Sequence, residues 1–316
     1  MVGTIPLNHK VAASMRPWTF VHLTDIHVGS PKSFRFAPAF NENWQTARRQ
    51  ILKIKPDLVL VGGDVTRDGY YHRFELEAIK ADLDTLPFPY HIVAGNSDVG
   101  DKFTDVSGSY GDRNDVELNI QSVSLQRFAS VFGPLCWSFL HEGVRFSGFC
   151  SMIAGSGLPE EDDLWVWMES LRNLPPADHH VWLMHYPLFI DHPHEPNFDI
   201  RDPKQYLHWY FGMDEPSRSR ILAMIRATGP STVISGHIHC RRHQFLEGIR
   251  FDKAPSTAFS QWEHQWPDGD PTLGFLRYDF NGEGITCTFV PLESLSTTKG
   301  DEAGEKERGW EQEKLP

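Results

Sequence analysis

Five short apolar runs in this 316-residue chain each end in residues that can bind a metal ion. The residues concerned are Asp25, His27, Asp64, Asn96, His185, His237 and His239. Carboxylate and amide oxygens, together with neutral imidazole nitrogens, suit metals such as Mn, Fe or Zn. Seven ligands exceed what one four-coordinate ion needs, so the set predicts two divalent or trivalent ions that share a bridging carboxylate.

Taken singly, each of these residues has a simpler explanation. Asp64 could be a turn residue, Asn96 a helix cap, and His185 a buried histidine that bonds its neighbours. The repetition of one design over five runs favours metal ligands instead. For Asp98, which follows Asn96 closely, we expect an orienting or capping role and no metal contact.

The runs alternate with segments of helical periodicity, which indicates an α/β fold. Apolar residues recur at helical spacing over residues 41–54, 70–83, 161–171 and 217–227. Alternating strands and helices are typical of a parallel sheet, in which ligands bind at the carboxyl ends of the strands. Hairpins are predicted over residues 242–253 and 273–291, the second around an Asn-Gly turn, and these later strands suggest a second sheet.

The pattern favours a single large domain over residues 18–292, preceded by a loose lead-in over residues 1–17. Insertions are expected at about residues 99–120 and 186–216. The second insertion is rich in Pro, His and aromatic residues and could wall or cover the metal rim. The polar tail over residues 293–316 is expected to be disordered in part.

Bulk properties exclude several classes of partner. A formal net charge of -12 argues against a protein that binds long nucleic acids, although bound metal ions still permit a phosphorylated substrate. The four scattered cysteines favour free thiols in a reducing compartment. The sequence has no convincing signal peptide and no apolar run of membrane-spanning length, so we expect a cytoplasmic protein with no membrane partner. The sequence sets no oligomeric state.

The ordered motifs resemble those of the calcineurin-like metallophosphoesterase superfamily, and of its class III cyclic-nucleotide and glycerophosphodiester phosphodiesterases in particular. The motifs are Asp25-Ile26-His27, Gly63-Asp64, Gly95-Asn96-Ser97-Asp98, His185 and Gly236-His237-Ile238-His239. The resemblance runs over residues 18–291. It implies a four-layer α/β/β/α sandwich with two mixed β-sheets.

The resemblance also implies a role for each matching residue. One ion would be bound by Asp25, His27 and His239, and the other by Asn96, His185 and His237, with Asp64 bridging both. The implied reaction is hydrolysis of a small phosphate ester by hydroxide held between the metals. The expected catalytic residues are Asp64, Asn96 and His237, and the expected substrate contacts are Asn96, Ser97, Arg67, His192 and His194. A solvated position for the two loop histidines, or a simple ion pair for Arg67, is the alternative.

One motif departs from the family pattern. Most members carry His after the Asn, in GNHD, and this chain carries Ser97. The change removes a proton donor near the leaving oxygen and leaves the metal ligands intact. Some branches with a small residue there are phosphodiesterases, so a phosphodiesterase is favoured, with a phosphomonoesterase or protein phosphatase, or an inactive metal-binding scaffold, as alternatives. His22, His192, His194 or His264 could supply the missing donor.

Overall fold

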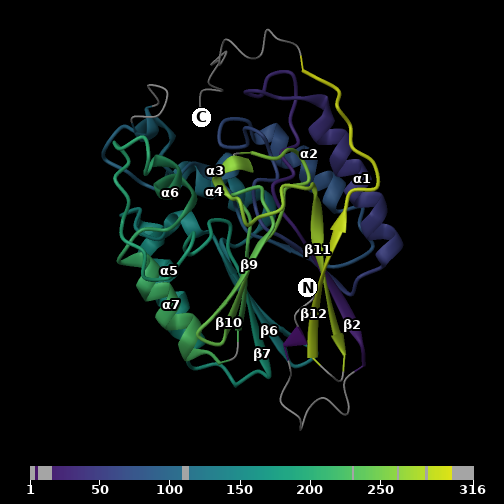
Figure 1. Ribbon diagram of the computed structural model, residues 1–316, viewed down its shortest axis with the longest axis vertical. Coiled ribbons are helices and arrows are strands. Elements are labelled where there is room, and N and C mark those ends of the chain that lie inside the picture. The colour runs from purple at the N-terminus through teal and green to yellow at the C-terminus, as the bar shows by residue number, and fades with distance from the viewer. Residues whose placement is uncertain are drawn as a thin grey trace.

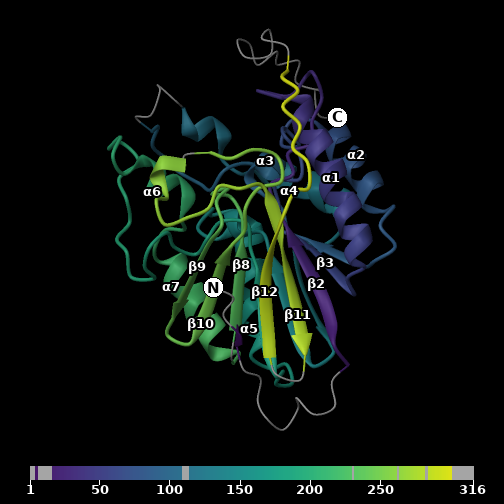
Figure 2. The ribbon, with the colours of Figure 1, turned by 45° about the vertical axis from the view of Figure 1, so that its right-hand side comes forward.

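The computed structural model describes residues 4–5, 16–108, 114–229, 231–261, 263–281 and 284–300. Two six-stranded sheets face each other, and helices cover their outer faces (Figures 1 and 2). Figure 1 places α1 and α2 on one side of the sheets and α5 and α7 on the other. The predicted four-layer α/β/β/α sandwich is therefore confirmed. None of the helices in the described part of the chain could cross a bilayer.

The first sheet has the strand order β1-β12-β11-β2-β3-β4. Its strands are β1 (Thr4–Ile5), β2 (Trp18–Leu23), β3 (Leu58–Val61), β4 (Tyr90–Ile92), β11 (Gly274–Asn281) and β12 (Gly284–Pro291). Strands β2, β3 and β4 are parallel, whereas β11 runs antiparallel to both of its neighbours. The helices α1 (Pro38–Ile54) and α2 (Arg73–Leu83) connect the parallel strands, as the helical periodicity predicts.

The second sheet has the order β5-β6-β7-β8-β10-β9. Its strands are β5 (Cys136–His141), β6 (Val144–Phe149), β7 (His179–Leu183), β8 (Ser231–Ser235), β9 (Arg242–Leu246) and β10 (Ile249–Lys253). The four central strands are parallel, and β5 and β9 pair antiparallel at the edges. The helices that cover this sheet are α5 (Pro159–Leu171) and α7 (Ser217–Ala227). The remaining helices of the fold are α3 (Asn96–Val99), α4 (Ser122–Phe132) and α6 (Tyr206–Phe211).

One expectation about the later strands needs correction. Of the two later hairpins that were predicted, only β9–β10 joins the second sheet, because β11 pairs with β2 and brings β12 into the first. The lead-in contributes β1, which pairs with β12. The first part of the tail follows α1, where Asn43 Oδ1 accepts from the amide of Ser296 at 2.8 Å. Residues 301–316 lie outside the described part of the chain.

An aromatic core joins the two sheets. Phe20 on β2 stacks on Tyr278 of β11 at 4.5 Å between ring centroids and meets Phe146 of the opposite sheet edge-on at 5.4 Å. All three side chains are buried. Because side chains alternate along a strand, Leu58 and Leu60 of β3 join this inter-sheet cluster, while Val59 and Val61 join the cluster that includes residues of α1 and α2. The sheets thus form a rigid frame for the loops at their ends.

Candidate metal centre

The structure brings the metal-type residues together in two buried groups. One group consists of Asp25, His27, Asp64 and His239, and the other of Asp64, His185 and His237. The ligand atoms within each group lie within 4.8 Å of one another. Asp64 belongs to both groups. Its Oδ2 lies 3.5 Å from His27 Nε2, and its Oδ1 lies 3.4 Å from His185 Nε2, so its two oxygens face different groups.

The loops that carry these side chains have an uncommon backbone conformation. Positive φ angles occur at Asp25 (53°), His27 (48°), Asp64 (50°), His237 (70°) and His239 (51°). Non-glycine residues rarely adopt this left-handed region, and such residues cluster at ligand-binding sites. A strand that ends in a left-handed residue turns sharply, which aims the side chain back across the end of the sheet.

Backbone carbonyls determine which imidazole nitrogen can bind a metal. His185 Nδ1 lies 2.8 Å from the carbonyl of Gly62, and His239 Nδ1 lies 2.8 Å from that of Phe259. Each Nδ1–H donates to its carbonyl, so Nε2 carries the lone pair. His239 Nε2 then faces His27 Nε2 at 3.1 Å and a buried oxygen of Asp25, Oδ1, at 3.2 Å. Lone pairs that converge at this distance fit a shared cation.

Asn96 completes the second group with an oxygen. Its Oδ1 lies 3.1 Å from His185 Nε2, while its Nδ2 donates to Asp101 Oδ1 at 2.8 Å. The carboxylate of Asp101 holds the NH2 end of the amide, so the amide oxygen points into the group. Sequence analysis identified Asn96 but missed Asp101, because the run of polar residues around it gave no signal that separates it from a loop.

Electrostatics at the site favour bound cations. Burial lowers the pKa of His27 and His237 well below 6.5, so both rings are neutral and can act as ligands. Burial alone would raise the pKa of Asp25, but the neighbouring His239 and other rings outweigh it and lower the pKa to about 2. Burial likewise acts to lower the pKa of His185, yet Asp64 and Asp25 raise it to about 9. Two buried carboxylates therefore attract positive charge into the cluster, which metal ions would supply.

Comparison with protein families decides the assignment. The family model of the calcineurin-like phosphoesterases matches residues 19–241. This chain belongs to that family. The match includes all seven residues of the cluster. A comparison with curated proteins finds no match.

Solved structures of this phosphoesterase fold resemble the chain at low sequence identity. A purple acid phosphatase from yellow lupin (Lupinus luteus) aligns with a TM-score of 0.59 and 12% identity over 90% of this chain. The chain spans 53% of that protein. A dimetal phosphatase from Danio rerio aligns with a TM-score of 0.54 and 14% identity, covering 90% of this chain and 99% of that one. GAP50, the anchor in the inner membrane complex of Plasmodium, gives a TM-score of 0.51 and 14% identity, covering 89% and 86%.

Ser97, which replaces the usual GNHD histidine of this family, faces the carboxylate of Asp64. Its amide donates to Asp64 Oδ1 at 2.8 Å, and its hydroxyl donates to Asp64 Oδ2 at 3.1 Å. Asp98, two residues after Asn96, accepts hydrogen bonds from the amides of Gly95 and Thr66 at 2.9 and 3.0 Å. The bond to Gly95 caps the start of α3, which agrees with the orienting or capping role expected for Asp98.

The predicted substrate contacts divide into two sets. Arg67 lies close enough to affect the pKa of His27, and its Nε donates to the carbonyl of Phe34 at 2.8 Å. His192 and His194 are exposed, and His194 Nε2 lies 3.5 Å from Glu247 Oε1.

Glu247 lies in the turn between β9 and β10. Strand β10 runs parallel to β8, so this turn is at the end of the sheet opposite His237. His194 therefore lies away from the metal centre. Both loop histidines are exposed, as their solvated alternative expects, and a substrate contact by His192 stays a prediction.

The other two candidate proton donors differ in their surroundings. His22 is fully buried, and a Cβ added to Gly62 would lie 2.7 Å from its Nε2, so the ring is behind the ligand loops. Burial lowers the pKa of His22 to about 3. His264 is exposed on a short 3-10 helix, Glu263–Gln265.

Sequence analysis missed Tyr210, which the structure places against the second group. Its hydroxyl lies 3.3 Å from Asn96 Nδ2, and its carbonyl lies 3.1 Å from His237 Nε2. Tyr210 is on α6, within the insertion that was expected to wall the rim. The insertion has no clear helical or strand periodicity. The sequence therefore predicted only that the insertion could wall the metal rim, and it did not single out Tyr210.

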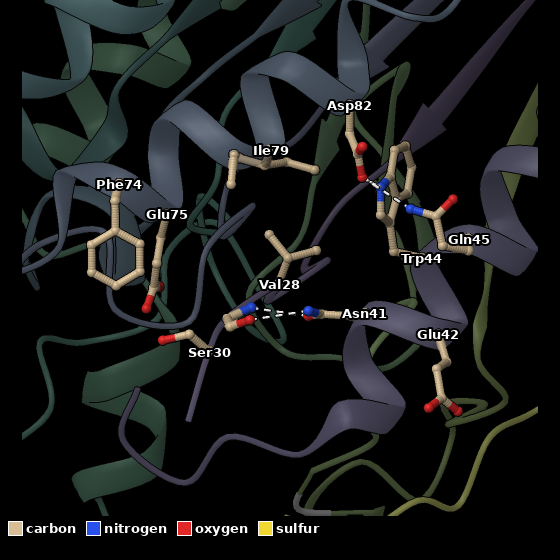
Figure 3. A pocket seen from close by; sticks show the side chains of 12 residues that line it. Val28, Ser30, Asn41, Glu42, Trp44, Gln45, Phe74, Glu75, Ile79 and Asp82 are labelled. Carbon is tan, nitrogen blue, oxygen red and sulfur yellow. Dashed lines mark hydrogen bonds between the residues drawn. The ribbon is translucent and has the colours of Figure 1, made fainter. Parts of the chain in front are cut away.

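A separate cavity of about 380 Å³ lies between α1 and α2 (Figure 3). Trp44, Phe74 and Ile79 line it, together with the loop that follows His27. None of the seven cluster residues is in its wall. Glu42, Glu75 and Asp82 also line the cavity, and the negative charge of Glu42 and Asp82 is unfavourable for an anionic ester.

Proposed function

We propose that this protein is a dinuclear metal-dependent phosphodiesterase. The position of Asp64 in both buried groups is the observation that carries the proposal. A carboxylate whose two oxygens face separate sets of ligands is suited to hold two cations at a short distance. All seven ligand positions are filled, which argues against a scaffold that has lost its metals. The four free thiols suit a reducing compartment such as the cytoplasm.

The residues of the cluster would bind two metal ions in two sets. Asp25, His27 and His239 would hold one ion, while Asn96, His185 and His237 would hold the other, with Asp64 shared. Mn, Fe or Zn ions bound there would lower the pKa of a water molecule and neutralise phosphoryl oxygens.

Arg67 is placed to bind the anionic substrate. Its side chain is half-buried, and Asp64 and Tyr210 are among the charges that act on its guanidinium. Burial lowers the pKa of Arg67 below its usual value, and the neighbouring acidic groups oppose that effect. An arginine offers planar donors that match phosphate oxygens, and it remains charged at neutral pH.

The small residue at position 97 supports a diester over a monoester, because some branches of the family with a small residue there are phosphodiesterases. The hydroxyl of Ser97 is bonded to Asp64, so it does not take the place of a general acid at the leaving oxygen. Esters with a leaving group of low pKa need no such donor. A phosphomonoesterase is the second candidate, because the similar structures from lupin and Danio rerio are described as phosphatases.

The test uses the purified protein, stripped by a chelator and reloaded with Mn. We expect hydrolysis of bis(p-nitrophenyl) phosphate to exceed that of p-nitrophenyl phosphate, and to disappear in His185→Ala. The matched control is His179→Ala. His179 is also buried and begins β7, the strand that precedes His185, but its Nε2 lies 2.9 Å from Thr232 Oγ1, outside both groups.

Faster turnover of the monoester would favour the phosphomonoesterase. Absence of hydrolysis of any ester, with Mn bound, would favour the scaffold. Equal activity in the two histidine variants would contradict the assignment of the site.

A further inference from the structure

The insertion between β7 and α7 contributes directly to the metal centre through Tyr210. Figures 1 and 2 show α6 toward the same end of the sandwich as α3, which begins at Asn96. The ring of Tyr210 lies 5.1 Å from that of His237, centroid to centroid, and its side chain is half-buried. Its hydroxyl therefore lies at the edge of the second ligand group, where a bound ester can reach it.

The carbonyl of Tyr210 orients a proposed ligand. His237 Nε2 lies 3.1 Å from this carbonyl, so an Nε2–H donates to it and leaves the lone pair on Nδ1. In His185 the lone pair is instead on Nε2, because Nδ1–H donates to the carbonyl of Gly62. Tyr210 thus contacts His237 through its backbone and Asn96 through its side chain.

Buried cations hold this part of the insertion in place. Lys102 Nζ donates to the carbonyl of Gly212 and to Asp214 Oδ2, both at 2.8 Å, and it lies 4.6 Å from the centroid of the Trp209 ring. Arg218 donates to the carbonyl of Met213 at 3.2 Å. These contacts flank Tyr210 on both sides in sequence. They restrict the motion of its hydroxyl relative to Asn96.

We propose that the Tyr210 hydroxyl donates a hydrogen bond to a phosphoryl oxygen of the bound ester, an inference that rests on the proposed function. A phenol can donate one hydrogen bond while it accepts another, and here it accepts from Asn96 Nδ2. Ser97 does not occupy this position, because its hydroxyl faces Asp64. Arg67 and Tyr210 lie close enough to interact electrostatically, so the guanidinium and the hydroxyl belong to the same region of the site.

The test measures binding of inorganic phosphate to the Mn-loaded protein by titration calorimetry. We expect Tyr210→Phe to weaken phosphate binding by about tenfold or more, as for loss of a hydrogen bond to a charged acceptor. Its Mn content should not change, because the carbonyl that orients His237 remains. The matched control is Tyr206→Phe on the same helix, whose buried hydroxyl donates to Asp115 Oδ1 at 2.7 Å.

The control separates a direct contact from the packing of α6. Tyr206→Phe should lower the thermal unfolding midpoint and leave phosphate affinity within about twofold of the wild type. Equal affinity in Tyr210→Phe and wild type would overturn the inference, as would an equal loss in both variants. With either of these results, hydrolysis of esters by the wild type would still support the proposed function. A wild type without any ester hydrolysis would overturn both.

Discussion

Replacing Asp64 by Asn tests whether one side chain supports two metal ions. Asp64 Oδ2 lies 3.5 Å from His27 Nε2, and Oδ1 lies 3.4 Å from His185 Nε2. Asn keeps the size of the side chain but has one oxygen and no charge. We therefore expect Asp64→Asn to weaken both ions. Asn96→Ala, which removes a ligand of one group only, should release one ion and retain the other.

The expected change in stability follows from mass action. An ion present at 100 times its dissociation constant stabilises the native state by about 2.7 kcal/mol. Two ions therefore contribute about 5 kcal/mol, if the unfolded chain binds neither. For domains of this size or somewhat smaller, that corresponds to roughly 10 °C or more in the unfolding midpoint.

The assay combines metal analysis by mass spectrometry with thermal unfolding, each with and without chelator. Wild type should hold two Mn ions per chain and lose roughly 10 °C on chelation, by the same mass-action reasoning. Asp64→Asn should show little response to the chelator. Asp82→Asn is the matched control, because Asp82 accepts from Trp44 Nε1 at 3.0 Å, away from the cluster. Two tightly bound ions in Asp64→Asn, with the wild-type response, would refute the bridging role.

Three further predictions concern the frame of the site. Gly95→Ala should abolish ester hydrolysis, because the added Cβ would lie 2.2 Å from Asp64 Oδ1. Gly212→Ala should remain active in the same assay, because the atom nearest to its added Cβ is 3.4 Å away. Burial raises the pKa of Glu75 from 4.5 to about 7, so the folded protein keeps a proton that the unfolded chain releases. Stability should therefore fall as pH rises from 4.5 to about 7, and Glu75→Gln should remove about 3 kcal/mol of that fall, measured by urea unfolding at pH 5 and pH 8. Phe20→Ala should cost about 3–5 kcal/mol in urea unfolding, because it empties the core between the sheets; a loss below about 1 kcal/mol would contradict that packing.

The ligand set was predictable because its signal is local. Each proposed ligand follows an apolar run within a few residues, and β3 and α7 occur at the bounds that the periodicity predicts. The parallel order of β2 and β3, with a helix between them, places Asp25 and Asp64 at the same end of one sheet. Strand type, strand end and crossover can all be inferred from neighbours in the sequence.

The rest depended on contacts between distant segments. The pairing of β11 with β2 joins residues more than 250 positions apart, and nothing near either strand specifies the partner. The carbonyls of Gly62 and Phe259, which select the metal-binding nitrogens of His185 and His239, are backbone groups that carry no residue signature.

By itself, the sequence of this phosphoesterase determined which side chains end the strands and therefore which chemistry is available. Only the tertiary structure decided how those side chains are oriented and what stands beside them. Tyr210 shows the difference, since it reaches Asn96 across 114 positions from a segment without periodicity. Local steric and hydrophobic preferences act over a few residues, whereas the approach of two loops depends on how the whole core packs.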